Sequence, residues 1–243
     1  MEKRDFFKTL GLAGLALAGL KVLDACNTDD GTTATATQGT GATGACVVAP
    51  SETEGPFPTH TPSSLVTTDI TSDRTGIPLA ITIAVKNTND SCNALANAIV
   101  DIWHCDKDGN YSEYGGGGMQ STNYTNVHFL RGRQTTNTNG EVNFTSIFPG
   151  WYNGRATHIH VHIYNRTGTS LLITQIAFPE GSNSAVVQVN ASSANGYTKG
   201  MSGYTYNASD NVFSDDDAGA EVGTVTGTIA NGFTLQHTIN VSA

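Results

Sequence analysis

The sequence PGWYNGRATHIHVHIY occupies residues 149–164 and ends in a run in which polar and apolar side chains alternate. Successive side chains of a β-strand point to opposite faces of the sheet, so this alternation predicts a strand. His158, His160 and His162 then share one face, and the aliphatic side chains between them share the other. The aliphatic face is typical of a strand that packs on a hydrophobic core. Imidazole is the commonest metal ligand, so three on one face indicate a metal site, with an ordinary polar outer face as the alternative.

Short strands follow one another along the rest of the chain. They are expected at residues 77–86, 98–105, 142–147, 157–164, 171–178, 185–189, 223–229 and 234–241. Turn signals such as Asn139-Gly140 and Pro149-Gly150 separate them. No stretch of this part shows the periodicity of an amphipathic helix, and residues 201–220 are expected to form a polar surface loop. The pattern predicts an all-β fold, an antiparallel β-sandwich in a single domain.

Residues 1–26 are predicted to form an export signal. A charged start precedes an apolar stretch at residues 9–20, which is too short to span a bilayer core of ~30 Å. Residues 3–8, KRDFFK, resemble a twin-arginine export signal in which lysine replaces the first arginine. Residues 23–26, LDAC, resemble a bacterial lipobox, with aspartate where a small residue is usual. We therefore expect export from the bacterial cytoplasm, as a periplasmic or secreted protein or as a membrane-anchored lipoprotein attached through Cys26.

Residues 27–45 are rich in Thr, Ala, Gly and Asp and contain almost no apolar side chain larger than alanine. Such a composition buries too little surface to fold, so it predicts a flexible linker between the signal and a body formed by residues 46–243. The chain has 12 Lys and Arg against 21 Asp and Glu, a formal net charge of −9. This balance argues against a nucleic-acid partner, which requires a basic face.

Four further stretches carry side chains suited to a site. They are TEGPF at residues 53–57, WHCDKDGNYS at 103–112, FLRG at 129–132 and TQIAFP at 174–179. Together with residues 149–164, they resemble the intradiol ring-cleavage dioxygenases in order and spacing. The chain departs from that family by having Phe57 in place of a tyrosine and a short gap between Tyr152 and His158. It has no room for the N-terminal helical domain of the catechol 1,2-type enzymes, so it is most similar to the protocatechuate 3,4-type catalytic core or to the small secreted enzymes.

The resemblance implies a non-haem iron(III) (Fe3+) site. In the family, two tyrosines and the two histidines of an H-x-H pattern hold the metal, and they match Tyr111, Tyr152, His158 and His160. His162 then lies outside the ligand set. Phenolate oxygen is a hard donor that suits iron(III), and the ferric charge favours loss of a phenol proton whose ordinary pKa is about 10.

The resemblance also implies three catalytic side chains. Arg155 would stabilise negative charge on the substrate, Gln175 would hydrogen-bond near it, and the Tyr152 phenolate would take up a proton. The expected substrates are O2 and a catecholic ring, opened between its two hydroxyls to a muconate-type diacid. The resemblance does not decide whether the substrate is catechol, protocatechuate or hydroxyquinol.

Two other functions compete with this interpretation. An iron(II) oxygenase with two histidines and one carboxylate also uses H-x-H, but it needs an acidic residue soon after the second histidine, and residues 161–170 contain none. The other alternative is a non-catalytic transthyretin-like or carbohydrate-binding β-sandwich at the cell surface, because sandwiches support many functions.

Three cysteines remain once Cys26 is assigned to the signal: Cys46, Cys92 and Cys105. An oxidising compartment permits one disulfide among them. Cys46–Cys92 is the preferred pair, because Cys105 lies in an expected strand beside the predicted site. A different pairing, or three free thiols, stays open.

Overall fold

The computed structural model describes residues 46–243, so the predicted export signal and linker lie outside the described residues. One sheet has four antiparallel strands in the order β4-β3-β6-β7. Their bounds are β3 Ile99–Trp103, β4 Arg131–Thr135, β6 His158–Tyr164 and β7 Ser170–Ala177. None of the helices within this part of the chain is long and apolar enough to cross a membrane.

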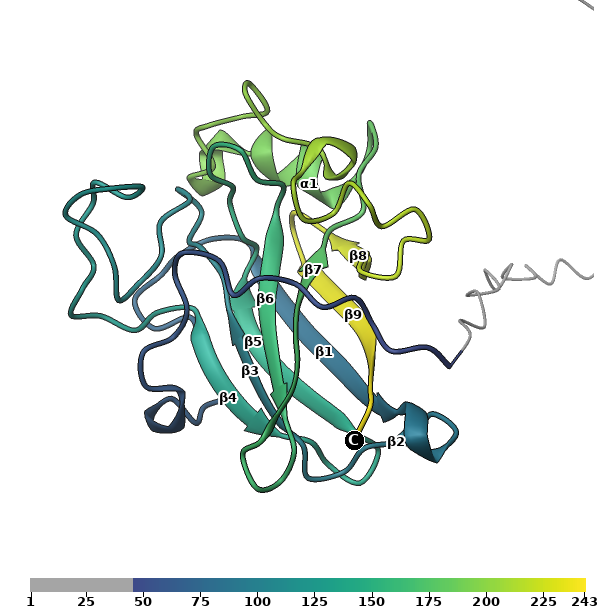
Figure 1. Cartoon of the computed structure of the whole chain (residues 1–243). Coiled ribbons are helices and arrows are strands. Elements are labelled where there is room, and N and C mark those ends of the chain that lie inside the picture. Colours follow the sequence, from purple (N-terminus) through teal and green to yellow (C-terminus); the bar gives the residue numbers. More distant parts are fainter. Residues whose placement is uncertain (1–45) are drawn as a thin grey trace, which may run out of the picture. The chain divides into compact units, whose positions relative to one another are not determined.

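The second sheet is built on β1, which pairs with β2 and β5 along one edge and with β9 along the other. Its strands are β1 Pro78–Asn87, β2 Asn93–Ala94, β5 Glu141–Ile147, β8 Thr224–Thr228 and β9 Gly232–Val241. The β1–β9 pair is parallel, and the other pairs are antiparallel. The predicted all-β sandwich is confirmed (Figure 1).

Both faces of β6 are buried, for two different reasons. Ile159, Val161 and Ile163 belong to the hydrophobic core, together with the aliphatic side chains of β1. The histidine face is covered instead by residues 52–60, which we call the strap. The strap hydrogen-bonds to β7, where the backbone N–H of Glu52 donates to the Ile173 carbonyl at 2.8 Å. The histidines predicted to share one face therefore lie beneath a second stretch of the chain.

The strand expected at residues 185–189 is wrong, because this stretch forms the helix α1, Ala185–Asn190. Ser184 caps its first turn by accepting a hydrogen bond from the N–H of Val187. Val186 and Val189, one turn apart, are buried on one face, which is a helical pattern too short to recognise in the sequence. Short 3-10 turns complete the chain: η1 Pro62–Ser64, η2 Thr88–Asp90, η3 Ser193–Asn195 and η4 Asn207–Ser209.

The expectation of a surface loop at residues 201–220 is also wrong in part. The segment contains no strand, but Tyr204, Asp210 and Phe213 are buried. The sequence prediction missed β2 and β4 as well.

The preferred disulfide is confirmed: Cys46 is joined to Cys92 across 46 residues of sequence, and Cys105 is a buried free thiol. Cross-linking residues this far apart restricts the unfolded chain, so we expect Cys92→Ser to lower the free energy of unfolding by about 2–4 kcal/mol. Urea titration checks this. Reductant should lower the stability of the unmodified protein to the same level and leave the variant unchanged; an unmodified protein that is insensitive to reductant would contradict the prediction.

Candidate metal centre

A row of side chains crosses the four-stranded sheet at one level. Arg131 pairs with Trp103, Trp103 pairs with His160, and His160 pairs with Gln175 in the strand register. Directly paired residues of antiparallel strands point to the same face of a sheet. Residues from four separate motifs are thereby placed side by side, facing the strap.

His158 and His160 occupy the start of β6 and are both fully buried. Nδ1 of His158 donates to the carbonyl of Ala156 at 2.6 Å, so Nε2 of the neutral ring carries the lone pair. The two Nε2 atoms of His158 and His160 lie 3.1 Å apart. Burial, and then the positive charge of Arg155, lower the pKa of His158 to about 3; burial, and then His158, lower the pKa of His160 well below its ordinary value. Both rings are therefore neutral and able to donate lone pairs.

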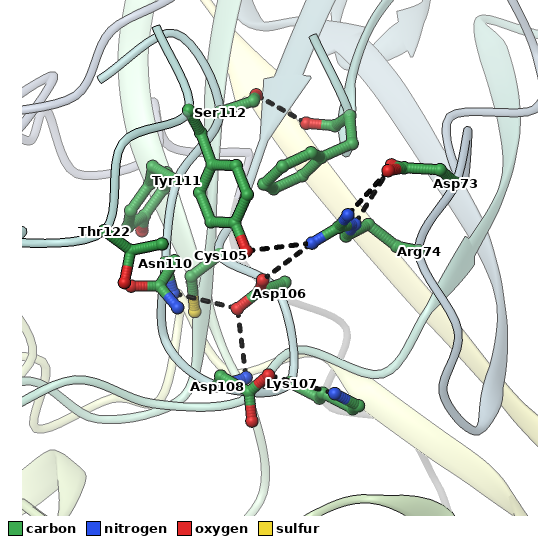
Figure 2. A network of polar contacts seen from close by, with 12 residues as sticks. Asp73, Arg74, Cys105, Asp106, Lys107, Asp108, Asn110, Tyr111, Ser112 and Thr122 are labelled. Atoms are coloured by element: carbon green, nitrogen blue, oxygen red, sulfur yellow. Dashed lines mark hydrogen bonds and ion pairs between the residues drawn. The ribbon is translucent and has the colours of Figure 1, made fainter. Parts of the chain in front are cut away.

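Tyr111 reaches the same place from the turn after β3. The buried Asp106 carboxylate shapes this turn by accepting the N–H groups of Asp108 and Asn110 at 3.0 and 2.9 Å, and Arg74 lies beside it, as Figure 2 shows. The Tyr111 hydroxyl lies 3.2 Å from Nε2 of His158. Burial, and then the nearby Tyr152, raise the pKa of Tyr111 well above its ordinary value.

Tyr152 comes from the turn that precedes β6, after Pro149-Gly150. Its ring centroid lies 5.8 Å from that of Tyr111 and 5.7 Å from that of His158. Its hydroxyl is buried and has no hydrogen-bond partner. The structure thus brings Tyr111, Tyr152, His158 and His160 together. Within residues 46–243, no three His, Cys, Asp or Glu side chains are arranged to hold a metal ion. This cluster instead combines two imidazoles with two phenols.

The strap closes over this cluster. Gly55 has φ of +69°, and a methyl group on its Cα would lie 2.9 Å from Cε1 of His160. Trp103 stacks on the same imidazole, with ring centroids 4.9 Å apart and an interplanar angle of 1°. Phe57, next along the strap, stacks on Tyr111 at 4.7 Å. Only a residue without a side chain allows the strap to approach His160 this closely.

Arg131 holds the strap and the Tyr111 turn together. The fully buried guanidinium donates to the carbonyls of Ser112 and Phe57 at 2.6 and 2.9 Å, and to Oγ of Ser112 and Oγ1 of Thr59 at 2.8 and 3.0 Å. Its carboxylate partner is Glu113, at 3.8 Å. This charge is therefore committed to structure.

Arg155 and Gln175 lie next to the cluster and are joined to each other. Nη2 of Arg155 donates to Oε1 of Gln175 at 2.7 Å, and Nε2 of Gln175 donates to the carbonyl of Thr53 in the strap at 2.9 Å. Nε of Arg155 donates to both oxygens of the Asp210 carboxylate, at 3.1 and 2.9 Å. Asp210 is fully buried and also accepts the N–H groups of Ala156 and Val212. Asp210 was not predicted as a site residue, because it lies in the segment expected to be a surface loop.

Two further histidines and a polar cavity lie outside the cluster. His162 is buried two residues beyond His160 along β6, between the hydroxyls of Tyr164 and Ser170. His104 packs in the core against Ser146. A polar cavity of about 220 Å³ is lined by Asp73, Arg74, Thr75, Asp106 and Lys107, whose charges pair among themselves and with Asp108, and none of the predicted ligands lines it.

Known proteins resemble the chain in sequence and in structure. An intradiol ring-cleavage dioxygenase from Tetranychus urticae is 28% identical with a TM-score of 0.69, over 81% of this chain and 95% of that chain. A chlorocatechol 1,2-dioxygenase from Rhodococcus opacus is 29% identical over 126 residues, which span 44% of this chain and 46% of that protein. The dioxygenase domain of a carbohydrate-binding fusion from Streptomyces sp. SirexAA-E shares the fold, at 23% identity and a TM-score of 0.56, over 81% of this chain and 99% of that domain.

The family model described as Dioxygenase matches residues 53–199, which is more than half of the chain. This range begins in the strap and includes the predicted ligands, Arg155 and Gln175. The chain belongs to the intradiol ring-cleavage dioxygenase family.

Proposed function

We propose that this chain is a non-haem iron(III) enzyme that opens a catecholic ring between its two hydroxyl groups with O2. The observation that carries the proposal is the meeting of two neutral imidazoles and two phenols at one buried place, with the imidazole Nε2 atoms 3.1 Å apart. A buried hydroxyl without a partner costs free energy, and Tyr152 presents one. A cation held by Tyr111, Tyr152, His158 and His160 would satisfy it, and hard phenolate oxygens with imidazole nitrogens suit iron(III).

The chemistry that iron(III) would supply there is activation of a catechol toward O2. Tyr152 Oη would accept a hydroxyl proton from the substrate, since burial raises the pKa of this phenol and favours its protonated state. Arg155 is already fixed by Asp210 and Gln175, so its guanidinium offers preorganised stabilisation of negative charge on a substrate oxygen. The bond between the two hydroxyl-bearing carbons breaks, and both atoms of O2 enter a muconate-type diacid.

The alternative with two histidines and one carboxylate lacks its third ligand. Within the described residues, no acidic side chain forms a three-membered group with His158 and His160. The donors that lie nearest are phenols instead. The composition of the cluster therefore favours a ferric, tyrosine-ligated enzyme.

Absorption spectroscopy and product analysis test the proposal together. Loading with iron(III) should colour the protein red-brown through tyrosine-to-iron charge transfer, and anaerobic catechol should shift that band. Under O2, catechol should give a diacid whose mass shows two added oxygen atoms. A protein that stays colourless with iron(III) and does not respond to catechol would overturn the proposal.

Two substitutions test the ligand assignment. Tyr152→Phe and His158→Ala should each weaken iron retention by at least about tenfold, because each removes one donor of the set. Metal content after dialysis against a weak chelator is the measurement. His162→Ala is the matched control on the same strand face, and it should keep its iron. Full iron occupancy in both ligand variants would show that the metal binds elsewhere.

A further inference from the structure

Two acidic residues flank Gln175 along the outer edge of β7, the edge that does not pair with β6. The backbone N–H of Glu52 donates to the carbonyl of Ile173 at 2.8 Å, two residues before Gln175. Two residues after it, the N–H of Ala177 donates to the carbonyl of Glu221 at 2.9 Å. The strap and a later segment of the chain therefore both bring a carboxylate to the strand that carries Gln175.

The later segment, residues 210–221, runs from Arg155 to this edge. It starts at Asp210, bonded to Arg155, and its Phe213 ring lies 5.6 Å from the Arg155 guanidinium carbon. Asp216 then accepts the N–H groups of Ala220 and Glu221, both at 2.8 Å. Asp216 is thus folded back toward Glu221, whereas Asp215 and Asp217 are exposed on the same segment.

The Glu221 carboxyl is an unusual group. It is 2% exposed, and neither of its oxygens has a hydrogen-bond partner. Burial, and then the negative charges of Glu52, Asp216 and Asp215, raise its pKa to about 8. Burial and then Asp215 raise the pKa of Glu52, which Arg155 opposes. Glu52 of the strap and the acidic residues of 210–221 therefore lie within electrostatic reach of one another, and Glu52 lies within reach of Arg155.

Positive charge does not balance this group. Within residues 46–243, Glu52, Asp215, Asp216 and Glu221 form no ion pair. The charge of Arg155 is offset by Asp210. Arg131 is bonded to Glu113 and to backbone carbonyls, and Lys199 donates to the carbonyl of Trp151 at 2.6 Å.

We propose that this acidic edge makes the site select catechols without a charged ring substituent and reject catechols that carry a carboxylate, a specificity that rests on the function proposed above. Both kinds of substrate bind through the same two hydroxyl oxygens. The difference between them is one extra negative charge on the ring. The proposed function places the ring against Arg155 and Gln175, and therefore brings this charge toward the acidic edge. Like charges repel across about 10 Å by an amount worth roughly a twofold change in affinity for each pair in a water-like medium.

Anaerobic calorimetry on the iron-loaded full chain tests this by comparing catechol with protocatechuate (3,4-dihydroxybenzoate). Catechol should bind at least about tenfold more tightly at low salt, and added salt should narrow the ratio by screening the carboxylates. Glu52→Gln and Asp215→Asn should each reduce the ratio of the two affinities by about two- to fivefold, mainly by increasing the affinity for protocatechuate. Neither side chain makes a hydrogen bond that the substitution would break. Asp90→Asn is the matched control. Asp90 lies in η2, after the far end of β1, and its substitution removes the same charge away from the β7 edge.

The possible outcomes separate the two proposals. If catechol does not bind, the proposed function fails and the specificity fails with it. If catechol binds and protocatechuate binds equally well, with no effect of salt or of Glu52→Gln, only the specificity is overturned. A ratio that Asp90→Asn narrows as much as Asp215→Asn would also overturn it, because overall charge and not the β7 edge would then be responsible.

Discussion

Gly55→Ala is expected to remove most of the iron from the protein while leaving the sandwich folded. The new methyl group would lie 2.9 Å from Cε1 of His160, closer than carbon atoms approach without a shift. Trp103 stacks on the imidazole in parallel planes and restricts how the ring can shift. His160 must therefore turn away from its position beside His158. Substitutions that disturb the orientation of a ligand commonly reduce metal affinity by about 10- to 100-fold, and we expect a loss in that range.

A matched variant separates this contact from backbone strain. Gly118 has φ of +62°, close to the +69° of Gly55, but a methyl group there meets nothing within 4 Å. Gly118→Ala should therefore show the cost of a left-handed alanine, about 1 kcal/mol of unfolding free energy, and keep its iron. Metal content after dialysis and thermal unfolding are the two measurements. Equal iron in the Gly55 and Gly118 variants would show that the strap does not position His160.

The part of the site that could be predicted from sequence is the part set by local geometry. The alternation in β6 places His158 and His160 on one face, because strand side chains alternate whatever the rest of the chain does. The pairing of His160 with Trp103 and Gln175 depends on strand register, which no local pattern encodes. Only the resemblance to a known family indicated which of these separate motifs meet at the site.

Other features depend on contacts that are remote in sequence. The β4 strand, Arg131–Thr135, is polar and contains a glycine, so it lacks the alternation of a half-buried strand. Arg131, at the start of β4, is buried because it finds hydrogen-bond partners in the strap and in the Tyr111 turn. Asp210 is similar: an aspartate in a Gly- and Asp-rich segment is typically solvated, and only the position of Arg155 makes its burial favourable.

Asp210→Asn is expected to reduce kcat/KM for a catecholic substrate by roughly 100-fold, because the Arg155 guanidinium would lose the carboxylate that orients it. It should also cost about 3 kcal/mol of unfolding free energy, since one partner of a buried ion pair is removed. Asp101→Asn is the control for this second effect. Asp101 is 2% exposed and pairs with Arg133, so its loss should lower stability with little change in kcat/KM. Comparable activity losses in both variants would mean that Asp210 acts through stability alone.

A double variant decides whether Asp210 acts through Arg155. Arg155→Met alone leaves the buried Asp210 carboxylate without its cation, so it should lower both activity and stability. If the carboxylate serves only to hold the guanidinium, adding Asp210→Asn should cause no further loss of kcat/KM. The same addition should restore part of the stability, because it removes an unpaired buried charge. Additive losses of kcat/KM would instead show that Asp210 contributes to the reaction by a route that does not pass through Arg155.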